Sequence, residues 1–229
     1  MVQINFFSER GDIGGNQVLL SHKDEKLWLD FGLSFKKTSR FINQLLEGRQ
    51  LPKMRLQELS KQGIIPPTEF LQEPFRVLTS HAHHDHFGAL FAPLEHNIKV
   101  ELFAPEDTLA LIKARMEVSA AGGLFGKAEV IPVPVEKKIS ISGFEVVPIV
   151  VDHSIDGSYS YLIFCPDGTC TYYTGDIRFD LTTSDQTLET IGEYADKVDV
   201  LVTELTGVHS RSPIKEKDVG IAMTNLSRK

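Results

Sequence analysis

The chain is poor in cysteine, has no long apolar run and carries more acidic than basic charge. Its two cysteines, Cys165 and Cys170, cannot form a disulfide framework. They flank a hairpin turn, which allows one cross-strand disulfide but favours two reduced, packed thiols. No apolar run is long enough to cross a bilayer, and residues 1–11 lack the basic and apolar segments of a secretory signal. We therefore expect a cytoplasmic protein that does not associate with membranes.

Other absences narrow the function. The net charge of −7 argues against a surface that attracts nucleic acid as a whole. No Gly-x-Ser-x-Gly motif is present, so the sequence gives no sign of a serine nucleophile. The 229 residues can bury one sizeable core, or one domain and the beginning of a second.

One segment departs from the acidic balance. Residues 31–63 contain two acidic side chains and seven basic ones: Lys36, Lys37, Arg40, Arg49, Lys53, Arg55 and Lys61. Helical periodicity over Thr38–Glu47 and Met54–Lys61 predicts a helical insertion at about residues 36–65. The basic side chains could form a phosphate-facing surface or a solvated helix face.

Four metal-binding side chains lie within six residues. His81, His83, Asp85 and His86 follow the apolar run Phe75–Leu78 as His-x-His-x-Asp-His. His81 and His83 can point the same way where a strand ends, because side chains repeat every second residue there. Imidazole and carboxylate suit zinc, or manganese where oxygen ligands dominate. The spacing predicts a hydrolytic site with two metal ions.

Two further ligand candidates follow predicted strands. His153 comes directly after the run Glu145–Val151, and Asp176 follows the run Thr169–Tyr173. Alone, either could be an ordinary loop residue, but their order after the first motif favours a shared site. Asp30 ends an earlier strand, where it could cap a turn, but we favour its orienting a ligand histidine by a hydrogen bond.

If these strand ends converge, the ligands divide between two ions. The first ion would be held by His81, His83, His153 and Asp176. The second would be held by Asp85, His86 and the same Asp176, which would bridge the pair. Two ions can clamp the attacking and leaving oxygens of a phosphodiester, and a coordinated water whose pKa falls to about 7 becomes the nucleophile.

Apolar runs and turns predict the rest of the fold. Hairpin-rich strands in two blocks, with helices between them, indicate two sheets covered by helices. The predicted strands include Val2–Phe7, Gln17–Ser21, Lys26–Asp30, Phe75–Leu78, Lys99–Ala104, Ala128–Val133, Phe144–Val151, Tyr159–Phe164, Thr169–Thr174 and a last buried strand, Val198–Thr203. Helices are predicted from Pro105 to about Val118 and over Thr187–Ala195.

The motif from His81 to His86, with Asp30 before it and His153 and Asp176 after it, resembles the metallo-β-lactamase superfamily. This resemblance implies an α/β fold, the αββα sandwich. Ile13-Gly14-Gly15-Asn16, the stretch from Leu29 to Phe35, and Asp152-His153-Ser154-Ile155 are similar to the β-CASP nucleases, the ribonuclease J branch in particular. Val202-Thr203-Glu204 lies where that branch has its acidic motif A.

The resemblance also sets an expected domain organisation. We expect a metallo-β-lactamase-like domain over residues 1–203. Enzymes of the β-CASP branch continue past motif A through an inserted domain and return with further histidines. Since this sequence ends at Lys229, residues 204–229 are expected to begin a truncated or missing β-CASP region. Whether the sandwich is complete at its C-terminal end stays open.

Three functions are consistent with these motifs. The first is a ribonuclease that cleaves single-stranded RNA, with Asp85 and Glu204 as catalytic residues and Glu204 either handling a proton or acting through a neighbouring group. The second is a thioester or lactone hydrolase, because the same metal chemistry serves carbonyl substrates. The third is a non-catalytic metal-binding fragment. Two divalent ions, zinc before manganese, are expected in the first case, and a homodimer is an open alternative to a monomer.

Overall fold

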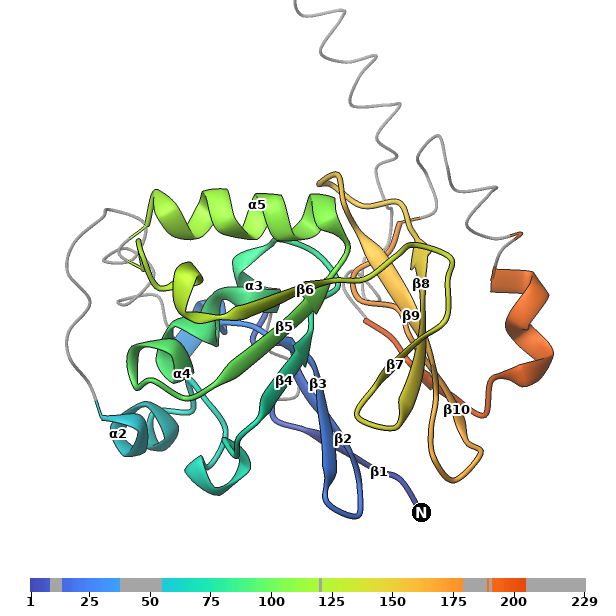
Figure 1. Ribbon diagram of the computed structural model, residues 1–229, viewed down its shortest axis with the longest axis horizontal. Helices are drawn as coiled ribbons and strands as arrows, with labels where there is room; N and C mark the ends of the chain where they lie inside the picture. The colour runs from blue at the N-terminus through green and yellow to red at the C-terminus, as the bar shows by residue number, and fades with distance from the viewer. Residues whose placement is uncertain (9–13, 38–54, 120, 179–188, 190, 205–229) are drawn as a thin grey trace, which may run out of the picture.

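Two β-sheets packed face to face form the centre of the protein. The computed structural model describes residues 1–8, 14–37, 55–119, 121–178, 189 and 191–204. Within these residues, eleven strands divide into a sheet of six and a sheet of five. Figure 1 shows helices outside each sheet, so the layers run helix, sheet, sheet, helix. The predicted αββα sandwich is confirmed.

The first sheet joins an antiparallel half to a parallel half. Strands β1 to β3 pair antiparallel, whereas β3 to β6 pair parallel. The strands, in spatial order, are β1 (Gln3–Phe6), β2 (Gln17–His22), β3 (Glu25–Phe31), β4 (Phe75–Leu78), β5 (Val100–Ala104) and β6 (Glu129–Pro132). The parallel half is covered on both faces, which explains why β3 and β4 read as nearly continuous apolar runs.

The second sheet is antiparallel except at one edge. Strands β7 to β10 pair antiparallel in chain order, and β11 pairs parallel with β10. The strands are β7 (Ile139–Ile141), β8 (Phe144–Val150), β9 (Tyr159–Phe164), β10 (Cys170–Tyr173) and β11 (Val200–Val202).

Short helices connect the parallel strands and cover the outer face of the first sheet. The α-helices whose bounds fall within the described residues are α2 (Leu56–Lys61), α3 (His84–Phe87), α4 (Phe91–Glu95) and α5 (Glu106–Glu117). The same residues include the 3₁₀ turns η1 (Thr68–Phe70), η2 (Gly88–Leu90) and η3 (Phe125–Lys127), and η4 (Ala195–Lys197), which precedes β11. Helix α5 begins directly after Pro105, close to the predicted start, and buries Leu109, Ile112 and Met116 on one face.

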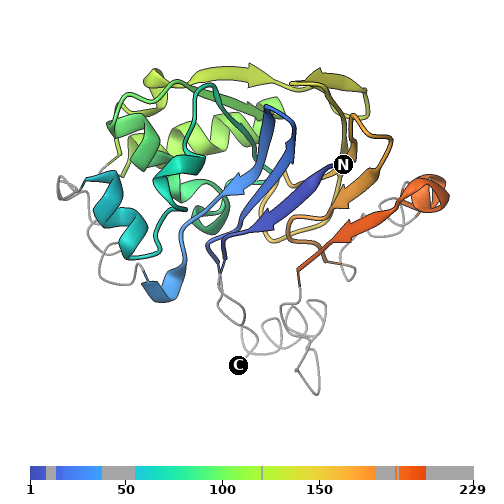
Figure 2. The same cartoon turned by 90° about the horizontal axis from the view of Figure 1, so that it is seen from below.

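Alternation along β3 shows how the sequence makes both cores. Leu27 and Leu29 face the second sheet, while Trp28 faces the helices. The pairing register shifts at Asp30, so Phe31 also faces the helices. The core between the sheets also contains Phe144 from β8 and Tyr161 from β9. Figure 2 shows the helices gathered on one side of the first sheet and the second sheet on the other. Side chains that alternate along one strand therefore build two separate apolar layers.

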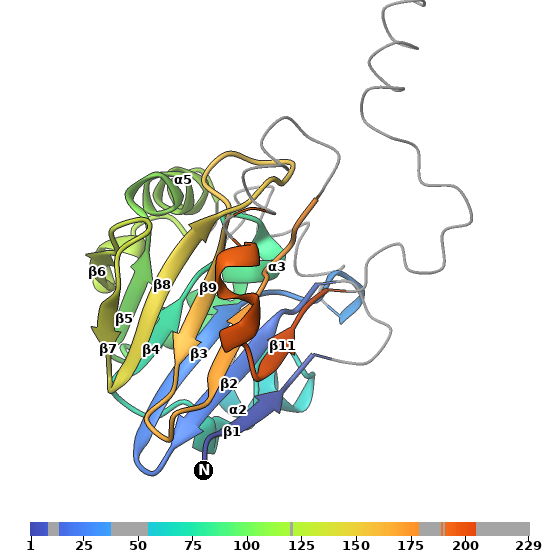
Figure 3. The same ribbon diagram turned by 90° about the vertical axis from the view of Figure 1, so that its right-hand side faces the viewer.

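The last strand differs from its prediction. Val198–Thr203 was expected to be a buried strand, but β11 forms the edge of the second sheet, and Leu201 is 60% exposed. Val202 is buried in the core between the sheets, and Val200 packs against that core while partly buried. In Figure 3 the short helix before β11 lies across the outer face of β9 and β10, where Ile191 and Tyr194 pack against the apolar cluster that contains Leu162. A run of valine and leucine does not distinguish an edge strand from a central one.

Several predictions fall on other parts of the chain. The predicted helix Thr38–Glu47, most of the basic insertion and residues 205–229 lie outside the described residues. The predicted boundary at residue 203 stays a prediction. Cys165 and Cys170 are both free and buried. Among the described residues, no helix is both long and apolar enough to span a membrane.

The topology brings five strand ends to one edge of the sandwich. Strands β3 and β4 end together because they are parallel. In the second sheet, β8 and β10 are both antiparallel to β9, and β11 is parallel to β10, so these three also end together. The two edges are joined where the Tyr159 backbone N–H donates to the Ser80 oxygen over 3.0 Å. Every predicted ligand follows one of these strand ends.

Gly32, just after β3, should tolerate no side chain. A Cβ there would lie 1.6 Å from the backbone oxygen of Asp85, because the end of β3 passes directly under α3. We expect Gly32→Ala to lower the free energy of unfolding by at least about 3 kcal/mol. Gly126→Ala is the matched control, since its Cβ would meet no atom within 4 Å. Urea denaturation followed by circular dichroism measures both, and equal stability of the two variants would contradict the close approach.

Candidate metal centre

Three histidines from two strand ends face one another. His81 follows β4, His83 is the N-cap residue of α3, and His153 follows β8. His81 Nε2 lies 2.9 Å from His83 Nδ1, and His153 Nε2 lies 3.2 Å from the same atom. Three imidazole nitrogens that converge from different directions fit the donor set of a divalent ion such as zinc. The predicted grouping of these three residues is present in the structure.

Asp176 lies between this group and His86. Its Oδ1 is 3.2 Å from His86 Nε2, and its Oδ2 is 3.6 Å from His153 Nε2. One oxygen therefore faces each histidine, as a bridging carboxylate requires. A second set of converging donor atoms comes from His81, His86 and Asp176. Asp85 was predicted in this set in place of His81; its Oδ2 is 3.7 Å from His86 Nε2.

Asp30 accepts hydrogen bonds from several residues around the centre. Its side chain is fully buried and accepts hydrogen bonds from the Ser80 backbone N–H and hydroxyl, each at 2.7 Å. Asp30 Oδ2 also accepts from the Tyr173 hydroxyl at 2.6 Å and from His86 Nδ1 at 2.7 Å. The backbone of Asp30 has a φ of +59°, which is uncommon outside glycine and marks a functionally constrained position.

These hydrogen bonds assign the protons on two histidines. A carboxylate only accepts, so His86 Nδ1 carries a proton and directs Nε2 toward Asp176. Ser80 gives its only hydroxyl proton to Asp30, so His81 Nδ1, 3.0 Å from Ser80 Oγ, must donate to it. His81 thus presents an Nε2 lone pair to the centre, and His86 would present one once an ion displaces the proton from its Nε2. This matches the orienting role predicted for Asp30.

Burial shifts the pKa values of the histidines. Burial and then neighbouring histidines lower the pKa of His81, and burial lowers the pKa of His83. Burial also lowers the pKa of His153 to about 4, against the opposing effect of Asp176. His86 is the exception: burial lowers its pKa, but Asp30 and Asp176 together raise it well above the ordinary value. The three grouped histidines are therefore unprotonated at neutral pH, as metal ligands must be.

The two carboxyls shift in opposite directions. Burial raises the pKa of Asp85, aided by Asp176 and opposed by His86. Burial also acts to raise the pKa of Asp176, but His86, His153 and His83 outweigh it and lower that pKa. Asp176 is consequently the more firmly ionised of the two.

Glu204 lies at the side of the centre. Its Oε1 accepts the backbone N–H of Ile177 at 3.0 Å, which ties the end of β11 to the loop that carries Asp176. It also lines a cavity of about 100 Å³ together with His86, Asp176 and Asn16. The structure thus brings Glu204 near the centre, in contact with the backbone that follows a candidate ligand. Its catalytic role stays a prediction.

Four residues near the centre were not predicted as site residues. Ser80 and Tyr173 contact Asp30, Asn16 contacts His86, and the positive charge of Arg115 lowers the pKa values of His81, His83 and His84. Ser80 adjoins the motif, and Tyr173 precedes Asp176 by three residues. The positions of Ser80 and Tyr173 at the ends of inward-facing strands could have indicated that both lie near the site. Arg115 lies in the last turn of α5, where no sequence pattern indicates its effect on the histidines.

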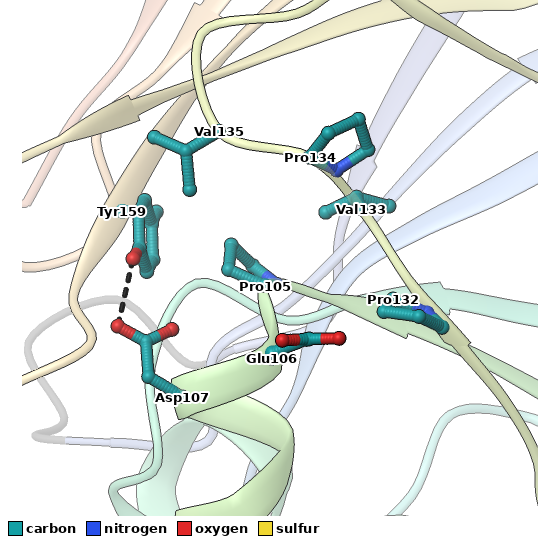
Figure 4. Close-up of a pocket in the computed structure, with 8 residues that line it drawn as sticks. All are labelled: Pro105, Glu106, Asp107, Pro132, Val133, Pro134, Val135 and Tyr159. Atoms are coloured by element: carbon teal, nitrogen blue, oxygen red, sulfur yellow. Dashed lines mark hydrogen bonds between the residues drawn. The ribbon is translucent and has the colours of Figure 1, made fainter.

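A larger cavity lies apart from these residues. It measures about 610 Å³ and lies at the ends of β5 and β6, where Figure 4 shows Tyr159 and Val135 on one side, Val133 and Pro134 on the other, and Pro105 between them. The Tyr159 hydroxyl donates to Asp107 Oδ2 at 2.8 Å. No candidate metal ligand lines this cavity, and its apolar walls and two carboxylates are poorly suited to a polyanion.

Removing Asp176 should reduce the metal content. Because its two oxygens face different histidines, we expect Asp176→Ala to retain at least one divalent ion fewer per chain than the wild type. Plasma emission spectrometry after dialysis against zinc or manganese provides the measurement. His96→Ala is the control, since the His96 ring contacts the Ala92 backbone oxygen at 2.9 Å and lies outside the cluster. Equal metal content in wild type and Asp176→Ala would contradict the bridging position.

The chelator-treated protein should lose stability in acid. A histidine whose pKa is lower in the folded than in the unfolded chain binds its proton preferentially when unfolded, so stability falls as the pH falls. For His84 and His153, with folded pKa values of about 4, this loss begins near the ordinary value of 6.5 and continues to about pH 4. His86 acts in the opposite direction, but it is one group against His81, His83, His84 and His153.

Urea denaturation in the presence of a chelator, at pH 7 and at pH 5, measures this effect. The midpoint should be lower at pH 5, and His84→Gln should narrow the difference between the two midpoints. His84 is suitable because it lies outside the group of converging donors. If His84→Gln showed the same difference between its midpoints at pH 7 and pH 5 as the wild type, burial of His84 would not be what lowers its pKa.

Comparison with known proteins agrees with this geometry. The chain resembles a protein of unknown function from Enterococcus faecalis V583, with a TM-score of 0.71 and 22% identity over 97% of this chain and 56% of that one. It also resembles the metallo-β-lactamase fold protein YhfI from Bacillus subtilis, with a TM-score of 0.50 and 14% identity over 76% of this chain and 62% of that one. The chain thus spans less than two thirds of each of these structures. At these identities the likeness establishes the fold alone.

The chain also matches the model of a protein family. The model of the family described as the beta-lactamase superfamily domain matches residues 51–227, more than half of the chain. The matched stretch contains the histidine motif, His153 and Asp176, the side chains that converge in the structure. The protein therefore belongs to the metallo-β-lactamase superfamily.

Proposed function

We propose that this protein is a metal-dependent hydrolase that cleaves phosphodiester bonds of single-stranded RNA at a dinuclear site. The observation that carries the proposal is the position of Asp176, with one oxygen toward His86 and the other toward His153. A carboxylate between two sets of imidazoles suits two adjacent cations, and paired cations suit phosphodiester hydrolysis.

The two proposed ions would share one carboxylate ligand. His81, His83, His153 and Asp176 would hold the first ion, and Asp85, His86 and the same Asp176 the second. When bound, two divalent ions lower the pKa of a coordinated water to about 7 and offset the charge on the phosphate.

The surrounding protein sets the protonation and the orientation of the ligand histidines. Burial keeps the grouped histidines unprotonated, so their lone pairs are available at neutral pH. Asp30 fixes the ring of His86, and Ser80 fixes the ring of His81, so neither must reorient to bind an ion. Glu204 holds the loop after Asp176 and is the nearest candidate to accept a proton in the small cavity.

Support for RNA comes from two sources. The glycine-rich turn ending at Asn16 and the acidic residue Glu204 are similar to the ribonuclease J branch, and both line the small cavity beside His86. The positive charge of Arg115 acts on the histidine cluster and would attract a phosphate there. We further propose zinc or manganese as the ion and the cytoplasm as the location.

The proposal is tested by removing the second ion's ligands together. Asp85→Ala/His86→Ala should abolish metal-dependent hydrolysis of a single-stranded RNA oligonucleotide, because an ion without its ligands supplies neither nucleophile nor charge. The assay is gel analysis of end-labelled RNA with zinc or manganese and with chelator.

The same preparation should be tested on a thioester and a lactone. Turnover of either in preference to RNA would favour the carbonyl-hydrolase alternative. Wild-type turnover of none of them, with metal bound, would favour a non-catalytic metal-binding protein. RNA cleavage by the double variant at the wild-type rate would remove the proposed mechanism.

A further inference from the structure

Asn16 places an amide directly at the metal-facing nitrogen of His86. Its Nδ2 lies 2.9 Å from His86 Nε2 and 3.2 Å from the backbone oxygen of Asp85. The Asp85 oxygen can only accept, so the amide nitrogen, rather than the amide oxygen, must face this side. One amide proton is thereby committed to Asp85, and the same amide nitrogen, which carries the second proton, lies beside His86 Nε2.

The backbone around Asn16 holds this amide in place. The backbone N–H of Asn16 donates to the backbone oxygen of Asp85 at 3.0 Å, and the backbone N–H of Gly32 donates to the backbone oxygen of Asn16 at 3.0 Å. Gly14 and Gly15 precede it with φ values of +81° and +71°, which let the turn pass close to Asp85 and Ser34. Asn16 is therefore pinned between the end of β3 and the start of α3, and its side chain is positioned before any ligand arrives.

The amide also lines the small cavity beside the centre. That cavity of about 100 Å³ has room for about three water molecules, or for a phosphoryl group in their place. The carboxylates of Asp176 and Glu204 line it as well and would repel an anion. An anion can enter only where cations offset those charges and where a donor faces it. Among the residues that line the cavity, Asn16 presents such a donor next to His86.

We propose that Asn16 is a phosphate-binding residue of this site. With an ion held at His86 Nε2, that nitrogen could accept no hydrogen bond, and the second amide proton would be available to donate to a phosphoryl oxygen of the substrate. Asn16 is thus assigned as a hydrogen-bond donor rather than a metal ligand. The inference rests on the proposed function, because it requires an ion at His86 and a phosphate substrate.

The test separates ion binding from anion binding. Asn16→Ala and Asn16→Asp are loaded with zinc or manganese, their metal content is measured, and inorganic phosphate is titrated by calorimetry. Both variants should keep the wild-type number of ions and bind phosphate about tenfold to a hundredfold more weakly, as expected for loss of a hydrogen bond to a charged oxygen. Asn16→Asp keeps the shape of the side chain if Asn16→Ala fails to fold.

Gln17→Ala is the matched control. Gln17 Nε2 donates to the backbone oxygens of Gly32 and Ile64, at 2.8 and 3.0 Å, and does not line the cavity. It should lower the melting temperature while leaving phosphate affinity at the wild-type value.

Three outcomes would overturn the assignment. Wild-type phosphate affinity in both Asn16 variants, with both ions bound, removes Asn16 from substrate binding and leaves the proposed function intact. Loss of an ion from Asn16→Ala makes Asn16 a ligand instead of a donor. If the wild-type protein binds neither ions nor phosphate, the proposed function fails first and the inference fails with it.

Discussion

The buried carboxylate of Asp30 is the constraint on which the candidate centre depends. A charge with no exposure to water is tolerated only when its hydrogen bonds are satisfied, and Asp30 has four, from Ser80 twice, Tyr173 and His86. These partners come from the end of β4, from β10 in the other sheet and from α3. The same interaction therefore joins the two sheets and orients His86, so that folding of the sandwich and preparation of the site are one event.

Parallel strand direction explains why distant residues meet. His81, His153, Asp176 and Glu204 follow β4, β8, β10 and β11, which end at one edge of the sandwich. Glycine allows the last approach: a Cβ on Gly175 would lie 2.8 Å from Ser80 Cβ, so the loop before Asp176 could not otherwise pass the motif. The rigid sheets fix the positions, and the loops contribute the chemistry.

Local signals explain what could be predicted from the sequence. The run Phe75–Leu78 matches β4 residue for residue, and the ligands adjoin strand ends, because both depend on short-range periodicity and spacing. Leu201 could not be placed, since exposure of an edge strand depends on its neighbours in space. Asn16 and Arg115 were missed for a related reason: neither a glycine-rich turn nor an arginine in the last turn of a helix indicates which histidine it will affect.

The charges of the centre explain why a cation belongs there. Asp85 and Asp176 both approach His86, and their mutual repulsion helps to raise the pKa of Asp85. Asp30 and Asp176 favour protonation of His86, and the positive charge of that histidine offsets part of this negative charge. The neighbouring His81 adds no positive charge, because burial lowers its pKa. A divalent ion at His86 Nε2 would replace one proton by two charges and relieve both carboxylates. Since such an ion binds the folded chain and not the separated ligands of the unfolded one, its binding free energy would add to the stability of the sandwich.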